Sequence, residues 1–469
     1  MNKGVKGLSI FAVVMLISGS IDSIRNLPTT ALFGTALVFF FVVSAIVFLI
    51  PAGLVSAELS SNKKLPAGVY GWVKTAFGKK IALLAIWLQW INTMVWYPTI
   101  LSFIAGTIAF LIDPALAQNK YYLIGTILTI FWFMTFISLR GTYASARFAS
   151  ICAVIGMVIP MFLIIGLGLL WAFTGKPLAI HFTSSDWIPT LSHGDSWISL
   201  TAIMTAFLGM ELAAVHVNDV KNPQKNFPRA LMYSVMFILM TMILGALAIA
   251  FVIPHNEIHL VDGIMQAFSA FLTMYHLQSL LPVLVVMLVI GSVGGMTNWI
   301  ISPAKGLLQA GEDGYLPKAL CKINKHGVAS RVLLIQAGLV SFVCLAFLLM
   351  PSVNGSYWLL TDLSTQLYML MYVLMFLAAV CIKFKVKDED AAFKIPGGKI
   401  GMSITCALGL IGCIATLIVG FIPPSSINVG GAAHYETMFV GGLLIMLLPT
   451  ALFYWYHRRQ TRCQLEREQ

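Results

Sequence analysis

The stretch that decides the fold is Ser18-Gly19-Ser20-Ile21-Asp22-Ser23-Ile24-Arg25-Asn26-Leu27-Pro28, which interrupts a hydrophobic run over residues 8–50. It places two opposite charges, three serines, a glycine and a proline near the depth of a membrane. Polar and ionisable groups at that depth are costly and mark a substrate or ion path. Irregular backbone is tolerated there only beside a cavity or inside protein. A first helix broken in this way is typical of secondary transporters built from inverted repeats, which bind their ligand at the break.

The composition is that of an integral membrane protein, so the lipid bilayer is the first expected partner. Of the 469 residues, 59% are hydrophobic and 10% are charged, and the mean hydropathy is +0.89, whereas a soluble domain carries about 25% charged residues. A segment of about 20 apolar residues can span a bilayer. We expect twelve such spans, over residues 8–30, 34–57, 81–112, 121–139, 148–174, 197–217, 230–253, 265–300, 332–350, 357–382, 401–422 and 437–456.

The net charge of +11 reflects orientation in the membrane rather than a nucleic-acid partner. If both termini lie in the cytoplasm, every Lys and Arg except Arg25, Lys120 and Lys176 falls in a terminal segment or in a cytoplasmic loop. Such an excess of basic residues in cytoplasmic loops is the positive-inside rule, which sets the orientation of membrane proteins. We therefore expect a multi-pass protein with both termini in the cytoplasm and no bound nucleic acid.

Signatures of enzymes and metal sites are missing from the sequence. The seven cysteines include no CxxC pair, so neither a zinc site nor a disulfide framework is expected. There is no GxSxG elbow, Walker loop or HExxH motif. We expect a protein that is not an enzyme and has no catalytic residues, no metal and no cofactor. Without a nucleotide-binding domain, transport would be driven by gradients.

The sixth span carries a second polar interruption, Thr205-Ala206-Phe207-Leu208-Gly209-Met210-Glu211-Leu212. A lone carboxylate stands there beside a glycine, about as far into its span as the first break. Since an odd number of crossings inverts a repeated unit, the two breaks indicate a five-plus-five inverted repeat. We predict an all-α polytopic membrane protein with broken helices 1 and 6, in one domain over residues 1–469. Repeat one covers about 8–174, repeat two about 197–382, and two extra helices lie within 401–456.

Asp22 and Arg25 are the charged residues of the first break, and two interpretations of them stay open. On an intact helix they share a face and could neutralise each other. On a broken helix, free backbone N–H groups attract a carboxylate, and a guanidinium binds one in a bidentate manner. Ser18, Gly19 and Ser20 offer hydroxyl and backbone groups beside them. A zwitterionic amino acid needs such a divided site, with donors for its carboxylate and acceptors for its ammonium.

Glu211 is expected to meet the substrate's ammonium, together with carbonyls of the break at Gly209, or to carry a proton. Burial favours the protonated form of a carboxylate, which suits the second role. The alternative is a structural hydrogen bond that ties the sixth span to a neighbouring helix.

Aromatic residues complete the predicted site. Phe207 and Trp299 are expected to close over the substrate, although Trp299 is equally suited to anchor the membrane interface. Tyr368 and Tyr372 are four residues apart and share one face of the tenth span. They could line the pocket or serve in ordinary packing.

Several motifs resemble the amino acid–polyamine–organocation transporter superfamily, and within it the bacterial glutamate/γ-aminobutyrate antiporters. They are Val215-His216-Val217-Asn218-Asp219 with Asn222-Pro223, Val252-Ile253-Pro254-His255-Asn256-Glu257-Ile258-His259-Leu260, Trp299-Ile300-Ile301-Ser302-Pro303, Asn324-Lys325-His326-Gly327-Val328 and Phe393-Lys394-Ile395-Pro396-Gly397-Gly398-Lys399. The resemblance implies alternating access and exchange of amino acids across the bacterial inner membrane. By position, Glu211, Trp299, Tyr368 and Tyr372 match residues of the family's helices 6, 8 and 10.

Two departures from the family pattern change the charge of the predicted site. Arg25-Asn26-Leu27-Pro28 stands where the antiporters have Tyr-Glu-Tyr-Pro, and Gly295 stands where they have an acid. We therefore predict a secondary amino-acid antiporter, and the specificity for glutamate and γ-aminobutyrate does not carry over to it. Proton-coupled uptake, with protons as a second ligand, is the alternative, and a sensor that does not transport is another. The sequence does not indicate the oligomeric state.

Overall fold

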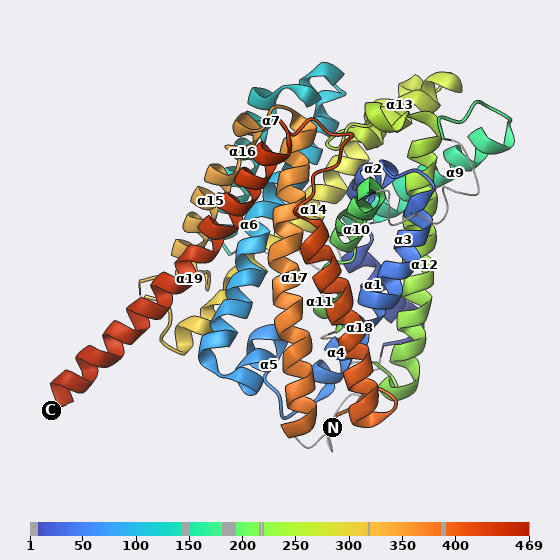
Figure 1. Ribbon diagram of the computed structural model, residues 1–469. Coiled ribbons are helices and arrows are strands. Elements are labelled where there is room, and N and C mark those ends of the chain that lie inside the picture. Colours follow the sequence, from blue (N-terminus) through green and yellow to red (C-terminus); the bar gives the residue numbers. More distant parts are fainter. Residues whose placement is uncertain are drawn as a thin grey trace.

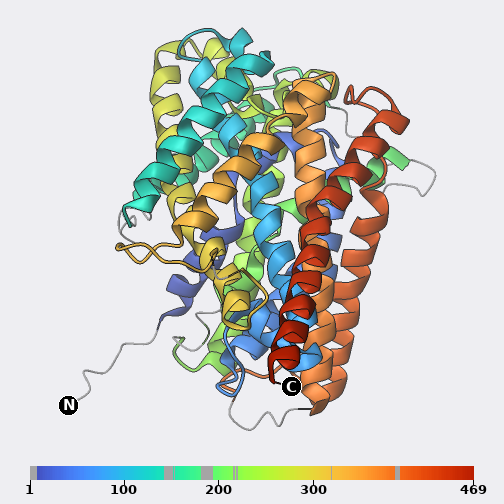
Figure 2. The ribbon, with the colours of Figure 1, turned by 90° about the vertical axis from the view of Figure 1, so that its left-hand side faces the viewer.

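The computed structural model describes residues 8–141, 151–152, 154–180, 194–214, 217, 220–317, 319–385 and 391–468. Within these ranges the chain forms helices joined by turns, with no strand beyond isolated bridges. Long helices run side by side between the two ends of the molecule, and shorter helices lie at those ends (Figures 1 and 2). This architecture suits a bilayer because each helix satisfies its own backbone hydrogen bonds.

Nine segments of the described chain are long and apolar enough to cross a membrane. A tenth is formed by α1 (Ile10–Ile21) and α2 (Leu27–Ala31) when this bent pair is counted as one span. Each of the ten overlaps a predicted span. The nine are α3 (Ala36–Ser44) with η2 (Ala45–Leu49) and α4 (Ile50–Ser61), α6 (Lys79–Ala109), α7 (Lys120–Leu139), η4 (Val154–Val158) with α9 (Ile159–Phe173), α12 (Pro223–Val252), α15 (Ser330–Val343) with α16 (Ala346–Leu349), α17 (Val353–Lys385), α18 (Gly398–Val419) and the first part of α19 (Ala432–Glu468).

The remaining two predicted spans are divided. The sixth consists of α10 (Gly194–Ala206) and α11 (Met210–Ala214), and the eighth contains α14 (Leu281–Glu312). Short helices lie between the longer ones: α5 (Gly68–Phe77), η3 (Pro114–Gln118), η6 (His255–Glu257), α13 (Gly263–Met274) and η7 (Gln278–Leu280).

The predicted start of the eighth span, at residue 265, is wrong. Residues 263–274 form the separate helix α13, and α14 begins only at Leu281. His276 has φ +56°, a left-handed conformation that a continuing right-handed helix does not contain. α13 buries one apolar face, including Phe268 and Phe271, against the core. Because α13 is as apolar as the span that follows it, the sequence pattern showed the two helices as one.

α6 and α17 lie against each other at the centre of the molecule (Figure 1). α6 is the most deeply buried of the candidate spans, yet it carries several hydroxyl residues. The Thr93 and Thr99 hydroxyls donate to backbone carbonyls three residues earlier, and Thr107 donates to one four residues earlier. Because these donors are satisfied within their own helix, α6 can bring polar side chains into the interior.

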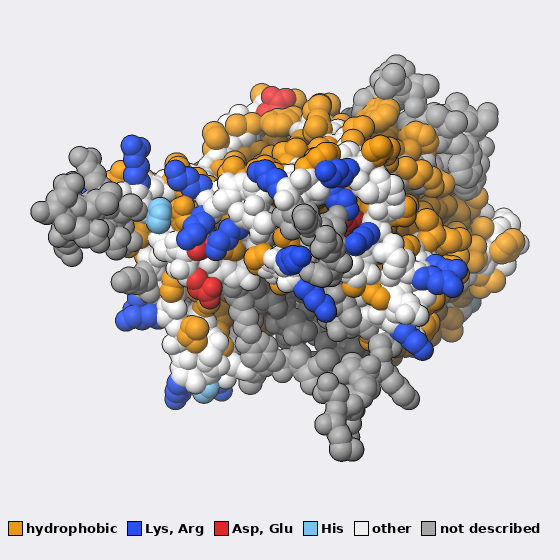
Figure 3. Space-filling model, turned by 90° about the horizontal axis from the view of Figure 1, so that it is seen from below, with side chains coloured by type: hydrophobic (Ala, Val, Ile, Leu, Met, Phe, Trp, Pro, Cys, Tyr) orange, Lys and Arg blue, Asp and Glu red, His pale blue; other side chains and the backbone are white. Residues whose placement is uncertain are grey.

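One end of the molecule is rich in basic side chains. α5 and the C-terminal ends of α17 and α19 lie at this end, which is the lower one in Figure 1. Seen from below, Lys and Arg side chains are spread over the face, and Asp and Glu are sparse (Figure 3). The face therefore has the charge that the positive-inside rule gives to a cytoplasmic surface.

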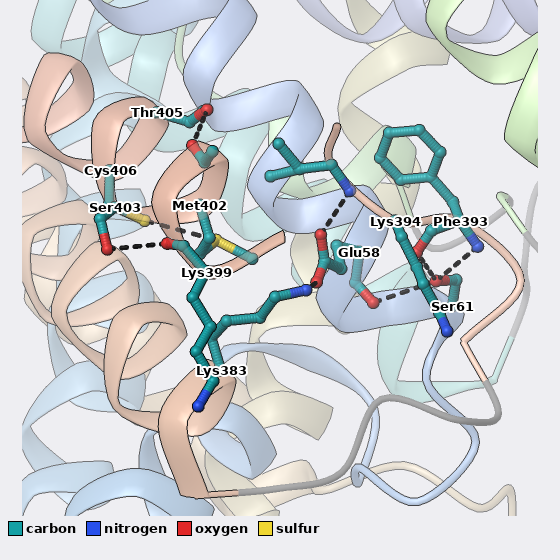
Figure 4. Close-up of polar contacts among 12 residues, drawn as sticks. Glu58, Ser61, Lys383, Phe393, Lys394, Lys399, Met402, Ser403, Thr405 and Cys406 are labelled. Atoms are coloured by element: carbon teal, nitrogen blue, oxygen red, sulfur yellow. Dashed lines mark hydrogen bonds and ion pairs between the residues drawn. The ribbon is translucent and has the colours of Figure 1, made fainter. Parts of the chain in front are cut away.

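The connection between α17 and α18 is held against α4 by buried polar contacts (Figure 4). Lys383 Nζ forms an ion pair with Glu58 Oε1, and the Ile395 backbone N–H donates to Glu58 Oε2 over 2.6 Å. Ser61 Oγ donates to the Phe393 carbonyl over 3.0 Å and accepts from the Phe393 N–H over 3.1 Å. Glu58 and Lys383 are both buried, and each Glu58 oxygen has a donor. This pair is a complete structural contact.

Candidate functional site

The first helix is interrupted directly after α1. Asp22 and Ser23 have extended backbone, with φ/ψ of −66°/122° and −144°/117°. η1 (Ile24–Asn26) then starts a new helical segment that α2 continues. The arms on the two sides of the break differ in direction by 45°. Irregular backbone inside a membrane bundle requires a cavity or protein around it.

The break lies a few residues later than Ser18, Gly19 and Ser20, where the sequence led us to expect it. These three residues still belong to α1, and the Asp22 N–H closes the last turn by donating to the Ser18 carbonyl over 2.7 Å. Ser18 is buried, and its hydroxyl has no hydrogen-bond partner in the described structure. Gly19 lines the cavity described below. The side chain of Ser20 lies outside the described part.

The second break separates α10 from α11 at residues 207–209, as predicted. Gly209 has φ +100°, a backbone conformation that strains residues with a Cβ atom. Its N–H donates to Tyr372 Oη over 3.1 Å. Phe207 is fully buried and packs edge-on against Phe41, with ring centroids 5.8 Å apart. The break therefore turns Gly209 toward α17.

The two breaks face a shared cavity of about 180 Å³. A cavity of this size suits a small organic molecule, since an engineered apolar cavity of about 150 Å³ binds benzene. α6, η4, α14 and α17 complete its walls. On the wall formed by η4 and α14, a Cβ atom on Gly156 would lie 2.2 Å from Gly291 Cα. The two backbones thus touch, and a larger residue at either position would push this wall apart.

Asp22 and Arg25 both line the cavity, but they bind different helices. Thr241 Oγ1 of α12 donates to Asp22 Oδ2 over 2.8 Å, and Arg25 Nη1 donates to Thr99 Oγ1 of α6 over 2.8 Å. The Arg25 guanidinium also lies over the Trp96 ring, 5.2 Å from its centroid. No ion pair joins the two residues in the described structure. On an unbroken helix Asp22 and Arg25 would lie on the same face, but here the chain leaves the helix at Asp22.

Both charged side chains of the first break keep an unused polar atom. Asp22 Oδ1 and Arg25 Nε are buried and have no hydrogen-bond partner in the described structure. Buried charged groups in folded proteins nearly always complete their hydrogen bonds, so two incomplete ones at one cavity call for an explanation. A ligand with a donor for Asp22 and an acceptor for Arg25 would complete both.

Glu211, in the first turn of α11, is surrounded by donors. Tyr368 Oη donates to Oε1, Tyr372 Oη donates to Oε2, and Gln89 Nε2 of α6 donates to Oε1 over 3.2 Å. Glu211 is buried and does not line the cavity, whereas Tyr368 does. This geometry matches the structural interpretation of Glu211, in which it ties the sixth helix to its neighbours.

Arg25 and Glu211 contact α6 at two different levels. Arg25 binds Thr99, and Glu211 binds Gln89, ten residues earlier on the same helix. At 1.5 Å per residue these contacts are about 15 Å apart along α6. Asn92, Thr93 and Trp96 line the cavity between the two contacts, and Ile100 and Phe103 line it beyond Thr99. The Glu211–Gln89 contact therefore lies toward the Lys79 end of the cavity, whereas the Arg25–Thr99 contact lies along its wall.

Sequence reasoning missed the polar residues that α6, α14 and α17 contribute to the cavity. These are Asn92 and Thr93, Ser292, and Ser364, whose hydroxyl donates to Asn92 Oδ1. The signal was present in the sequence, since an asparagine within an apolar span is itself costly. Trp299 lies on α14, but its side chain is outside the described part. In that part, no three His, Cys, Asp or Glu residues form a group that could hold a metal ion.

The chain is similar to known transporters along nearly its whole length. Residues 8–447 match the profile of a family described as amino acid permease. An uncharacterised transporter of Legionella pneumophila is 40% identical over 460 residues, which cover 98% of this chain and 99% of the relative. A glutamate/gamma-aminobutyrate antiporter of Lactococcus lactis is 26% identical over 466 residues, covering 98% and 93%. The putrescine transporter PotE of Escherichia coli is 24% identical over 333 residues, covering 70% and 72%.

Proposed function

Because the chain belongs to the amino acid permease family, we propose that it exchanges amino acids across the bacterial inner membrane by alternating access. The observation that carries this proposal is the polar cavity between two broken helices, where Asp22 and Arg25 each keep an unused atom. Broken helices that meet at a central cavity are the usual binding sites of secondary transporters.

The proposed architecture has twelve spans. The ten apolar segments, the divided helix α10 with α11, and α14 make up this number. Residues of about 8–174 and 197–382 form the two inverted five-helix repeats, and α18 and α19 are the extra helices. The basic face of Figure 3 lies in the cytoplasm together with both termini.

In the proposed cycle, two contacts on α6 open in turn. With the Lys79 end of α6 in the cytoplasm, the Arg25–Thr99 contact is the one nearer the outer side and the Glu211–Gln89 contact is the one nearer the cytoplasm. Release of Arg25 from Thr99 admits the substrate from outside. Release of Glu211 from Gln89 and from Tyr368 and Tyr372 delivers it to the cytoplasm.

The substrate is held by groups of both breaks. Asp22, Arg25 and the backbone at Ser18, Gly19 and Ser20 act from the first helix, and the backbone at Gly209 acts from the sixth. Tyr368 contributes to the cavity wall. Phe207 and Trp299 are assigned to occlusion, in which an aromatic ring excludes water from a bound ligand.

Counterflow in reconstituted vesicles tests the proposal. Vesicles preloaded with an unlabelled amino acid should take up the same labelled amino acid, while empty vesicles should not. A panel of common amino acids and their decarboxylated amines identifies the substrate. Binding without any counterflow or accumulation would instead indicate a sensor.

Proton-coupled uptake is a second candidate, favoured by the buried carboxylate of Glu211 between two tyrosine hydroxyls. A carboxylate between two movable halves could take up a proton on one side and release it on the other. Empty vesicles with an imposed pH gradient distinguish the candidates, since a symporter accumulates substrate in them and an exchanger does not. Glu211→Gln should abolish accumulation driven by the pH gradient if Glu211 carries the proton.

A further inference from the structure

We infer that the cavity selects amino acids without net charge, binding the substrate's ammonium at Asp22 and its carboxylate at Arg25. This inference rests on the proposed transport function and names the substrate class of the same site. It implies that the site disfavours substrates with a net charge, such as glutamate and putrescine, which appear in the names of two relatives.

Asp22 offers an acceptor for the substrate's ammonium. Its side chain is 6% exposed and reaches the cavity from the break itself. Oδ2 accepts one hydrogen bond from Thr241, and Oδ1 accepts none in the described structure. A buried carboxylate oxygen without a donor is unfavourable, and an ammonium group brings three donors and the compensating charge.

Arg25, which is 7% exposed, offers donors for the substrate's carboxylate. Thr99, a neutral hydroxyl, accepts from Nη1, and Nε has no partner in the described structure. The Trp96 ring covers the guanidinium plane, so ligand contacts are directed to its edge. The edge of a guanidinium matches a carboxylate through paired N–H donors.

Glu211 is less suited than Asp22 to accept the ammonium. It accepts hydrogen bonds from Tyr368, Tyr372 and Gln89, and it does not line the cavity. Asp22 lines the cavity, and its Oδ1 has no donor in the described structure. The structure therefore assigns the ammonium to the first helix.

The charge balance of the cavity also favours a substrate without net charge. Among its described lining residues, Asp22 and Arg25 are the two with formal charges, and these cancel. A zwitterion without net charge pairs with both and leaves the site neutral. Glutamate would leave the buried site with a net charge of −1, and putrescine would leave it with a net charge of +2 and Arg25 without a carboxylate. Unpaired buried charge is a strong means of rejecting a competing ligand.

Three closely matched probes test this inference on the purified full-length protein. γ-Aminobutyrate has no net charge, glutamate is γ-aminobutyrate with one more carboxylate, and putrescine has an aminomethyl group in place of the carboxylate. Alanine and leucine extend the neutral set to shorter and branched molecules. Affinities follow from thermal stabilisation as a function of ligand concentration. At least one neutral probe should bind ten-fold or more tightly than both glutamate and putrescine; equal or tighter binding of either charged probe overturns the inference.

Two variants test the assignment of charges. Asp22→Asn makes the site positive and should raise the glutamate-to-neutral affinity ratio at least ten-fold. Arg25→Gln makes it negative and should raise the putrescine-to-neutral ratio by a similar factor. Asp362→Asn is the matched control, because Asp362 is a buried carboxylate of α17 that binds Tyr435 and Gln366 and does not line the cavity. It should leave both ratios unchanged.

If the two variants change the preference among the probes in opposite directions, the inference is supported. A purely structural role of Asp22 and Arg25 would instead weaken the binding of all probes together. Parallel weakening of every probe overturns the assignment to Asp22 and Arg25. If a variant does not fold, the wild-type probe series still decides the substrate class. Counterflow of glutamate or putrescine alone would leave the proposed transport function standing and remove this inference, whereas counterflow of no amino acid or amine would remove the transport function itself.

Discussion

Two places in the molecule bury opposite charges, and they differ in how completely those charges are paired. At the end of α4, Glu58 binds Lys383 and the Ile395 N–H, so both of its oxygens have donors. At the first helix break, Asp22 and Arg25 bind separate helices, and each retains an unused buried atom. The exposed fractions are similar, at 3% and 7% for the first pair and 6% and 7% for the second.

We propose that this difference separates charges that hold the fold from charges that bind substrate. A buried ion pair is tolerated when hydrogen bonds satisfy its remaining donors and acceptors, and removing one partner leaves a costly isolated charge. Glu211 belongs to the first class, although it lies beside a helix break, because three donors surround it. On this proposal, completeness of hydrogen bonding, more than position in the membrane, indicates which buried charges bind substrate.

The largest effect on stability is expected from breaking the ion pair between Glu58 and Lys383. Lys383→Met leaves Glu58 buried without its counter-ion and should lower the free energy of unfolding by about 3–5 kcal/mol. Thermal unfolding in detergent measures the loss. Lys385→Met is the matched control, since Lys385 is exposed near the end of the same helix.

The double variant Glu58→Gln with Lys383→Met sharpens this test. It removes the isolated charge while keeping an acceptor for the Ile395 N–H, so most of the lost stability should return. If Lys383→Met alone unfolds at the wild-type temperature, Glu58 and Lys383 do not hold the fold, and the comparison fails.

The next effect concerns function. Arg25→Ala should abolish exchange and weaken substrate binding by about 10–100-fold, the range of one lost charge-assisted contact of roughly 1.5–3 kcal/mol. Its unfolding temperature should stay close to that of the wild type, because the Thr99 hydroxyl keeps its bond to the Trp96 carbonyl. Binding titrations and thermal unfolding of the same preparation test both statements. Retained affinity with lost stability would instead identify Arg25 as a structural residue.

A smaller effect is expected at the second break. Tyr372→Phe removes one donor to Glu211 and the acceptor of the Gly209 N–H. Leaving such groups unsatisfied should cost about 1–3 kcal/mol of stability. Tyr368→Phe removes only a donor to Glu211 and should cost less. Equal unfolding temperatures for the two variants would show that the Gly209 contact contributes nothing.

Most of the architecture was predictable because it depends on local composition. The ten apolar segments follow the hydropathy of the chain, and the family resemblance drawn from short motifs is confirmed by the match over residues 8–447. The error at α13 has a physical cause: an apolar face buried against protein and one in contact with lipid have the same composition. Hydropathy alone therefore cannot separate α13 from α14.

The site was predictable only in part, since its geometry depends on contacts between distant segments. The stretch from Ser18 to Pro28 revealed that the first helix breaks, but Asp22 is directed by Thr241, 219 residues away in sequence. The cavity residue Asn92 lies on an unbroken helix, where a polar side chain can serve packing or binding equally well. Only the structure shows that Ser364 binds it from α17.

The smallest effect is expected for Asp313, which is paired with lysines near the protein surface, where water weakens each contact. Burial raises the pKa of Asp313, but hydrogen bonds from Lys74, Tyr70 and Lys79 outweigh it and lower that pKa to about 2. A depressed pKa stabilises the fold above the unfolded value of 3.8, and this stabilisation is lost as the pH falls toward 2. Asp313→Asn should therefore cost about 1 kcal/mol at pH 6, since both lysines are partly exposed.

Unfolding temperatures of wild type and Asp313→Asn, compared from pH 6 down to pH 3, measure this contribution. The difference should shrink below about pH 3.8, because Asp313 of the unfolded chain takes up a proton there while Asp313 of the folded protein stays charged. It should also shrink in high salt, which screens exposed pairs. Glu312→Gln is the matched control, because the neighbouring Glu312 is exposed and should contribute little. A difference that stays constant across this pH range would mean that the Asp313 charge is not what stabilises the cluster.

Salt should matter far less for Lys383→Met, because the Glu58–Lys383 pair is shielded from water. That contrast would show that complete pairing stabilises strongly only when the pair is also buried.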